Sequence, residues 1–242
     1  MASPSRRITD TGDCGLATRG FLAHLGPHAR ETLLGAGRPL RFSAHETLLR
    51  EGEQSQHVLL IVSGRVKIVA TAPNGYEAVL AIRGPGDLIG ELACIDNMPR
   101  SATVAALGPV HTRIMPRVIF DDFLTDHPVA AKVLVRMVAW KLRCANRRRL
   151  EFSAYPVRLR LALVLLELEE WYGRSGHAGR DLDLALSQTD LAGLVGASID
   201  SVSKAIRALS QARVIATGRR RVTILRLDEL REIAAPIAAR CR

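Results

Sequence analysis

Two periodicities of apolar residues divide the chain. Between about residues 40 and 115, short apolar runs alternate with polar positions and are separated by turns rich in glycine, asparagine and proline, as is typical of antiparallel strands. A helical pattern at residues 20–34 precedes this region and predicts one or two short helices. The strands are expected at residues 57–62, 65–70, 78–82, 102–107 and 110–114.

A helical period then runs from residue 129 to residue 155 without glycine or proline and predicts one helix of about 25 residues. One apolar stripe has the spacing of a coiled-coil seam and consists of Ala131, Val135, Val138, Leu142 and Ala145. A second stripe on an adjacent face consists of Val133, Met137, Trp140 and Cys144. We expect one stripe to cover the β-region and the other to meet a second copy of the helix; burial inside one monomer is the alternative.

The C-terminal part has the element order of a winged helix-turn-helix. Ser187 and Ser198 are N-cap residues for the two helices of the helix-turn-helix, and Gly196 lies in the turn between them. The predicted elements are a helix at 157–171, a loop at 173–179, a strand at 181–185, helices at 188–195 and 199–210, and strands at 213–217 and 222–225 around a basic tip.

Charge is distributed unevenly along the chain. The formal net charge is +10, and residues 141–242, with 19 Lys and Arg against 11 Asp and Glu, carry +8 of it. We therefore expect the C-terminal part to bind a polyanion. The apolar fraction of 48% supports a folded core, and the four scattered cysteines predict neither a zinc nor an iron–sulfur site. With no apolar segment of membrane-spanning length and no signal-peptide core, the expected location is the cytoplasm and no membrane partner is expected.

Together these patterns predict an α+β protein. It would contain an antiparallel sandwich or barrel, a long dimerisation helix and a C-terminal winged helix-turn-helix domain. The family resemblance given below implies that the first of these is a jelly-roll-like β-roll sensor domain. The expected boundaries are a flexible N-terminal tail at 1–15, the β-roll at 16–127, the dimerisation helix at 128–154 and the DNA-binding domain at 155–242.

The segment 86–104, which we call the cassette, contains the most specific local pattern. Gly90 permits close approach of the backbone, and a helical turn beginning near Glu91 offers free N–H groups. Arg100 and Ser101 add further donors, so the segment is suited to hold an anion. Glu91 can accept a hydrogen bond from a sugar hydroxyl beside that anion, which indicates a nucleotide. The alternative is an ion pair between Glu91 and Arg100 that only supports a turn.

This segment resembles the phosphate-binding cassette of cyclic-nucleotide-binding domains. After residue 20 the chain resembles transcription regulators of the catabolite activator/fumarate–nitrate regulator (CRP/FNR) family. The resemblance implies that Glu91 accepts from the ribose 2′-hydroxyl and that Arg100 and Ser101 hold the cyclic phosphate. The implied ligand-binding residues are Gly90, Glu91, Leu92, Ala93, Arg100, Ser101, Ala102 and Asn146.

In the cAMP-responsive members of the family, adjacent hydroxyl residues on the long helix contact the base, and the matching positions in this chain are Ala145 and Asn146. Asn146 can offer a donor and an acceptor to the base edge, within one chain or across a dimer. Family frequency favours cyclic AMP as the effector; cyclic GMP, another nucleotide or no ligand remain open. No tightly bound cofactor and no enzymatic activity are expected.

The helix predicted at 199–210 has an apolar face that packs, with Val202, Ile206 and Leu209, and an opposite face that projects, with Asp200, Lys204, Arg207 and Gln211. The base-reading positions implied by the family are Ile199, Asp200 and Lys204, and all three differ from the usual residues, so we expect an unusual operator. The predicted DNA-binding residues are Ser187, Gln188, Ser198, Ile199, Asp200, Ser201, Lys204, Arg207, Arg219, Arg220 and Arg221. The expected partners are double-stranded DNA with a palindromic operator, a second copy of the chain through Val135, Val138, Leu142 and Ala145, and RNA polymerase.

Overall fold

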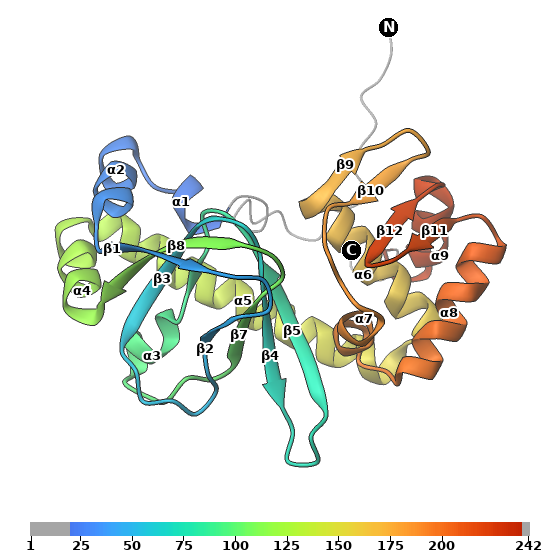
Figure 1. Ribbon diagram of the computed structural model, residues 1–242, viewed down its shortest axis with the longest axis horizontal. Helices are drawn as coiled ribbons and strands as arrows, with labels where there is room; N and C mark the ends of the chain where they lie inside the picture. Colours follow the sequence, from blue (N-terminus) through green and yellow to red (C-terminus); the bar gives the residue numbers. More distant parts are fainter. Residues whose placement is uncertain (1–19, 239–242) are drawn as a thin grey trace, which may run out of the picture.

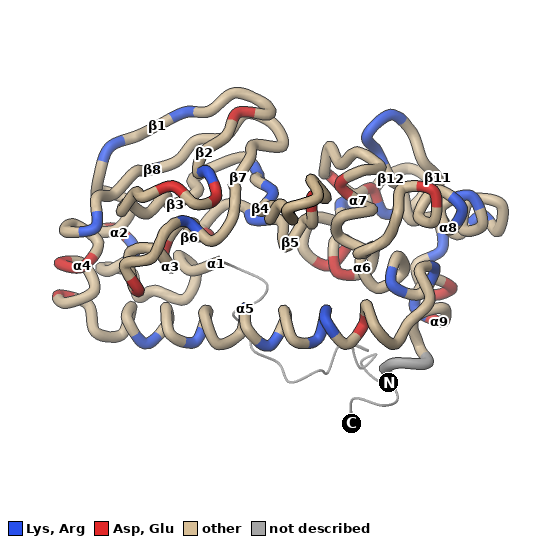
Figure 2. The backbone as a smooth tube through the Cα atoms, turned by 90° about the horizontal axis from the view of Figure 1, so that it is seen from below, with Lys and Arg blue, Asp and Glu red and all other residues tan. Residues whose placement is uncertain are grey.

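A computed structural model describes residues 20–238 of the chain. The predicted tail at 1–15 lies outside the described residues. The fold is α+β as expected: a β-roll and a smaller C-terminal domain lie side by side, and one long helix runs beneath both (Figures 1 and 2). Among the described residues, no helix is both long enough and apolar enough to cross a membrane.

The β-roll consists of two four-stranded antiparallel sheets. One sheet has the strand order β1 (Arg38–Phe42), β8 (Val110–Pro116), β3 (His57–Ser63) and β6 (Leu88–Ile89). The other has the order β2 (Thr47–Leu49), β7 (Thr103–Ala106), β4 (Val66–Thr71) and β5 (Glu77–Arg83). The five strands predicted individually are present; β1, β2 and β6 were not predicted individually.

Four helices accompany the β-roll: α1 (Gly20–Ala23), α2 (Pro27–Gly35), α3 (Glu91–Asp96) and α4 (Arg117–Asp126). The pattern at 20–34 predicted the first two, whereas α4 was not predicted. Its residues Phe120 and Phe123 join a core that includes Phe21 and Met115. A separate apolar cluster, with Leu59 among its fully buried residues, includes side chains from both sheets.

The long helix α5 (Pro128–Ala154) has 27 residues and begins with a proline in its first turn. Val133 and Met137 of the second predicted stripe are buried against the β-roll core. By contrast, Val135 and Leu142 of the first stripe are 68% and 62% exposed. The helix therefore buries one apolar stripe within the chain and leaves apolar residues of the other open to solvent.

The C-terminal domain has the predicted order of helices and strands. It consists of α6 (Val157–Tyr172), β9 (Gly173–Ser175), β10 (Arg180–Leu182), α7 (Gln188–Val195), α8 (Ile199–Gln211), β11 (Ile215–Gly218), β12 (Arg221–Ile224) and α9 (Leu227–Ala238). The prediction of a loop throughout 173–179 was wrong, because residues 173–175 form β9 and pair with β10. The helix α9 was not predicted.

The first helix of the helix-turn-helix, α7, is tied to the β-roll at its N-terminus. Ser187 and Asp190 form the predicted capping box, and the Asp190 carboxylate also accepts from Lys67 Nζ of β4 at 2.5 Å. Burial acts to raise the pKa of Asp190, but the hydrogen bonds from Lys67 and Ser187 outweigh it and lower the pKa. The stabilisation from this pair is therefore present above the ordinary pKa of Asp and is lost as the pH falls through the lowered value.

The two domains also share one apolar core. Val79 of β5 and Leu194 of α7 belong to the same buried cluster, together with residues of α6 and α8. Gly193 of α7 faces β5 so closely that a Cβ at this position would lie 2.8 Å from the backbone nitrogen of Val79. The close approach of α7 to β5 thus depends on a residue without a side chain.

We predict that Gly193→Ala lowers the free energy of unfolding by about 1–3 kcal/mol, because either α7 or β5 must shift to admit the methyl group. Urea unfolding measures this change. Gly108→Ala is the matched control, since its Cβ would meet nothing within 4 Å. Equal unfolding curves for the two variants would contradict the close packing of α7 on β5.

Candidate functional site

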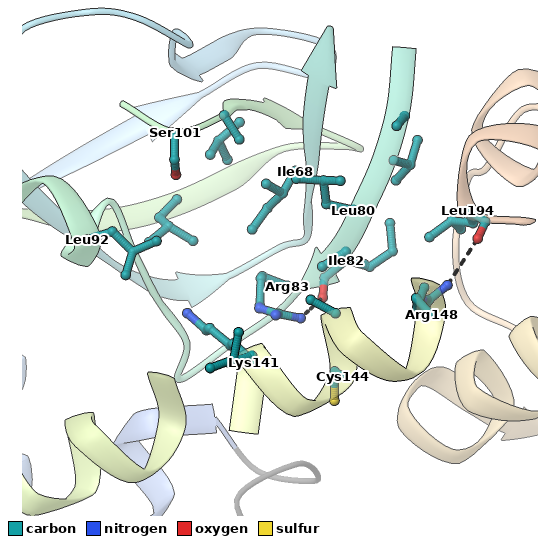
Figure 3. Close-up of a pocket in the computed structure, with 18 of the residues that line it drawn as sticks. Ile68, Leu80, Ile82, Arg83, Leu92, Ser101, Lys141, Cys144, Arg148 and Leu194 are labelled. Atoms are coloured by element: carbon teal, nitrogen blue, oxygen red, sulfur yellow. Dashed lines mark hydrogen bonds between the residues drawn. The ribbon is translucent and has the colours of Figure 1, made fainter. Parts of the chain in front are cut away.

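A cavity of about 740 Å³ lies where the β-roll, α5 and the C-terminal domain meet (Figure 3). Its walls come from the cassette, β5, α5, α6 and α7. A volume of this size is typical of small-molecule sites. Because Gly193 and Leu194 of the helix-turn-helix line it together with the cassette, a ligand in this cavity would contact both domains.

The cassette bends sharply at Gly90, whose φ of +82° lies in the left-handed region that favours glycine. A Cβ at Gly90 would lie 2.6 Å from Nη1 of Arg100. The Arg100 side chain is held by three hydrogen bonds: Nε donates to Ser55 Oγ at 2.9 Å, Nη1 to the Gly90 carbonyl at 2.7 Å and Nη2 to the His57 carbonyl at 2.8 Å. The Arg100 side chain therefore fixes the shape of the cassette through these three hydrogen bonds.

The structure places Arg100 at the cavity wall but only 3% exposed. Each of its guanidinium nitrogens already has a protein acceptor, although the fork retains further N–H groups. Ser101 also lines the cavity, is exposed, and has no hydrogen bond through its hydroxyl among the described residues. Of the two predicted phosphate-binding residues, Ser101 is the one whose side chain is free.

Glu91 does not pair with Arg100, so the alternative of a Glu91–Arg100 ion pair is wrong. Its carboxylate instead accepts from Lys141 Nζ of α5 at 2.7 Å, and the Glu91 side chain is only 5% exposed. This ion pair joins the cassette to the long helix. Lys141 was not predicted from the sequence. The available signal was Glu91 itself, because a carboxylate that becomes buried in the cassette requires a cation from another part of the chain.

The other predicted ligand-binding residues lie at different depths. Gly90, Leu92, Ala93 and Ala102 line the cavity with Glu91. Asn146 is exposed and does not line it; the residues of α5 that do are Val138, Trp140, Lys141, Leu142, Cys144, Ala145, Arg148, Arg149, Phe152 and Ser153. Contact between Asn146 and a ligand in the same chain is therefore not supported, and contact across a dimer stays a prediction.

Aromatic and cationic side chains gather between β5 and α5. The rings of Trp140 and Trp171 lie 5.8 Å apart, and the guanidinium carbon of Arg83 lies 5.9 Å from the Trp140 ring centre. Burial raises the pKa of Asp87, although the charges of Arg83 and Lys141 oppose this shift. Within residues 20–238, no group of three or more His, Cys, Asp or Glu side chains is arranged to hold a metal ion.

The second candidate site is the projecting face of α8. Val202, Ile206 and Leu209 are buried, as the helical period predicted. The side chains of Asp200, Lys204 and Arg207 on the opposite side are exposed, and so is Ile199 in the first turn of the helix. Ser198 caps the helix by accepting from the Ser201 backbone N–H, and Gln188 of α7 accepts from Ser203 at 3.0 Å.

The basic tip between β11 and β12 contains Arg219, Arg220 and Arg221, all exposed. Arg220 Nη1 lies 2.9 Å from Nε2 of His45 in the β-roll, and Arg221 donates to Asp181 of β10. Two of the three predicted phosphate-binding arginines thus have partners within the chain. The sequence did not indicate that the tip would reach the β-roll.

Two family models match the chain. A cyclic nucleotide-binding domain matches residues 39–127, and a Crp-like helix-turn-helix domain matches residues 159–233. The first match contains the cassette, and the second contains α7, α8 and the basic tip. The two matches together cover both candidate sites.

Two curated relatives span most of the chain. A "CRP-like cAMP-activated global transcriptional regulator" of Mycobacterium tuberculosis is 32% identical over 79% of this chain and 85% of its own length. The "Cyclic AMP receptor protein" of Thermus thermophilus is 29% identical over 78% of this chain and 84% of its own length. Among solved structures, the c-di-GMP-responsive global regulator CLP of Xanthomonas campestris has the same fold, with a TM-score of 0.73, 19% identity, and coverage of 82% of this chain and 99% of that chain.

Proposed function

We propose that this chain, which belongs to the CRP/FNR family of DNA-binding transcription regulators, acts as a homodimer whose binding to DNA is controlled by a cyclic nucleotide. The observation that carries the proposal is the position of the cavity. Its walls include the cassette and two residues of α7, so an occupant would contact the sensor domain and the helix-turn-helix together. A ligand that binds one arrangement of these walls better than another shifts the population toward that arrangement.

The cassette supplies the groups for a sugar and a cyclic phosphate. Ser101 offers its free hydroxyl to the phosphate, and Arg100 adds the remaining N–H groups of its fork. Glu91, already bonded to Lys141 through one oxygen, has a second oxygen for the ribose 2′-hydroxyl. These residues recognise the parts common to all cyclic mononucleotides. Cyclic AMP is the effector expected from family frequency and from the names of the two relatives, but the cassette itself does not select a base.

The exposed apolar stripe of α5 supports the homodimer. Val135 and Leu142 lie seven residues apart and expose most of their surface, and Val138 and Ala145 continue the spacing of a seam. Pairing with the same stripe of a second copy would bury these side chains in an isologous contact. The two copies of α8 would then address two half-sites of a palindromic duplex about 34 Å apart.

On the DNA, α8 would enter the major groove. Lys204 is exposed without an ion-pair partner among the described residues and can donate to guanine O6 or N7. Asp200 can accept a hydrogen bond from cytosine, and Arg219 at the basic tip can donate to a phosphate.

RNA polymerase is a further proposed partner, and the cytoplasm is the proposed location. No chemical reaction is proposed for the chain.

A second candidate function is regulation of DNA without an effector. The observation that favours it is the engagement of Arg100 and Glu91 within the protein, by backbone carbonyls and by Lys141. In that case the cavity would no longer be an effector site, and DNA affinity would not depend on nucleotides. Titration with nucleotides separates the two functions.

We predict that Ser101→Ala weakens binding of a cyclic nucleotide about tenfold or more, because a hydrogen bond to a charged phosphate is lost. Isothermal titration with cyclic AMP, cyclic GMP and a non-cyclic nucleotide measures this. Ser101 is the better test than Arg100→Ala, which also leaves the Gly90 and His57 carbonyls without their donor. No saturable binding by the wild type, or unchanged affinity in Ser101→Ala, would contradict the assignment of the cassette.

We predict that Lys204→Ala weakens binding to the selected operator about tenfold or more, in line with the loss of one good base contact. The operator is first selected from random duplexes, and affinities for it and for random DNA are compared at one salt concentration. An equal loss on both DNAs would show that Lys204 contacts a phosphate and reads no base.

We predict that the wild type sediments as a dimer at micromolar concentration and that Val135→Glu sediments as a monomer, because a charge would be buried in the seam. Val129→Glu is the control: Val129 is 67% exposed, much like Val135, but lies on the opposite side of α5 from the stripe. A monomeric wild type, or equal behaviour of the two variants, would remove the basis for the homodimer.

A further inference from the structure

Arg83, the last residue of β5, is a buried cation without an acidic partner. It is 8% exposed and lines the cavity. Its one hydrogen bond runs from Nη1 to the carbonyl of the adjacent Ile82, at 2.9 Å, and it forms no salt bridge within residues 20–238. Figure 3 shows its guanidinium beside Lys141 at the base of the cavity. A buried charge is costly unless a partner compensates it, and one hydrogen bond to a backbone carbonyl leaves the Arg83 guanidinium with most of its N–H groups unused.

The groups packed around Arg83 do not supply that partner. Asp87 directs its carboxylate to the Gly84 backbone N–H at 2.9 Å, and Tyr172 of α6 donates to the same Ile82 carbonyl as Arg83. On α5, the Lys141 ammonium is a second cation and pairs with Glu91, and Trp140 has its ring near the Arg83 guanidinium but carries no negative charge. Arg83 is therefore the buried cation between β5 and α5 whose charge no carboxylate of the described residues compensates.

We infer that Arg83 is a specificity-determining residue. It selects an effector that presents hydrogen-bond acceptors, and no donor, to the cavity wall formed by β5 and α5. The inference rests on the proposed cyclic-nucleotide function and names the base. Guanine presents O6 and N7, two acceptors that match a guanidinium fork, whereas adenine presents an N6 amino donor beside N7. An arginine has only donors, so the N6 amino group of adenine would face N–H groups that it cannot bond.

A second kind of effector can present the same hydrogen-bond acceptors to Arg83. The cavity of about 740 Å³ has room for more than one mononucleotide, so a second phosphate of a cyclic dinucleotide could also be the acceptor group for Arg83. Cyclic GMP and cyclic IMP both carry O6 and N7, and cyclic IMP lacks the exocyclic amino group of guanine. Comparing these two with cyclic AMP and cyclic di-GMP therefore distinguishes a base edge from a phosphate.

The experiment follows binding by the fluorescence of the full-length protein. The chain has two tryptophans, Trp140 and Trp171, and both line the cavity. For the wild type we expect cyclic GMP and cyclic IMP to bind about tenfold or more tightly than cyclic AMP, and Arg83→Met to abolish most of that difference. Arg83→Lys keeps the charge but loses the fork and should recover only part of it. Arg136→Met, at an exposed residue of α5 that does not line the cavity, is the matched control and should leave the preference unchanged.

Thermal unfolding without nucleotide gives a second readout. If Arg83 serves the ligand, Arg83→Met should leave the melting temperature unchanged or raise it, because a buried unpaired charge is replaced by an apolar side chain of similar length. A clearly lower melting temperature would assign Arg83 to the fold and overturn the inference.

The binding outcomes separate this inference from the proposed function. Cyclic AMP binding as tightly as cyclic GMP and cyclic IMP, or a preference that Arg83→Met leaves intact, overturns the inference while the proposed function stands. Binding of cyclic di-GMP alone, weakened by Arg83→Met, supports the acceptor site with phosphate as its source. No binding of any of the four nucleotides overturns both.

Discussion

The packing of α7 against β5 is the contact on which the arrangement of the two domains depends. Gly193 allows the close approach, Val79 and Leu194 share one core across it, and Lys67 of β4 holds the capping residue Asp190. The Asp190 carboxylate both caps α7 and pairs with Lys67. The N-terminal end of α7 therefore cannot move away from the β-roll without breaking this ion pair. The position of the DNA-binding domain is therefore coupled to the sensor sheet through a few identifiable side chains.

The cavity follows from that contact, since α7 closes a space that the cassette, β5 and α5 leave open. Two cations that line the cavity differ in whether an acidic partner compensates them. Glu91 and Lys141 neutralise each other and join the cassette to α5, whereas Arg83 remains without a counter-ion among residues 20–238. Lys141 is thus paired within the protein, whereas Arg83 is available to an effector. This difference gives the site a basis for selecting its ligand.

Sequence patterns predicted the parts of the structure that depend on local periodicity. The strands of the β-roll, the long helix and the two helices of the helix-turn-helix follow from alternation, the 3.6 period and the capping residues Ser187 and Ser198. The strands β2 and β6 are too short, at three and two residues, to show alternation. Lys141 and Arg83 could not be assigned because their roles arise from contacts between elements far apart in the chain. The docking of Arg220 on His45 likewise depends on how the domains pack.

Hydrogen–deuterium exchange with and without a saturating cyclic nucleotide tests most directly whether the cavity couples the two domains. If the cavity couples the domains, binding changes the exchange of backbone amides in α7 and β5 as well as in the cassette, because all three line the cavity. Altered exchange confined to the cassette, with α7 and β5 unchanged, would contradict it.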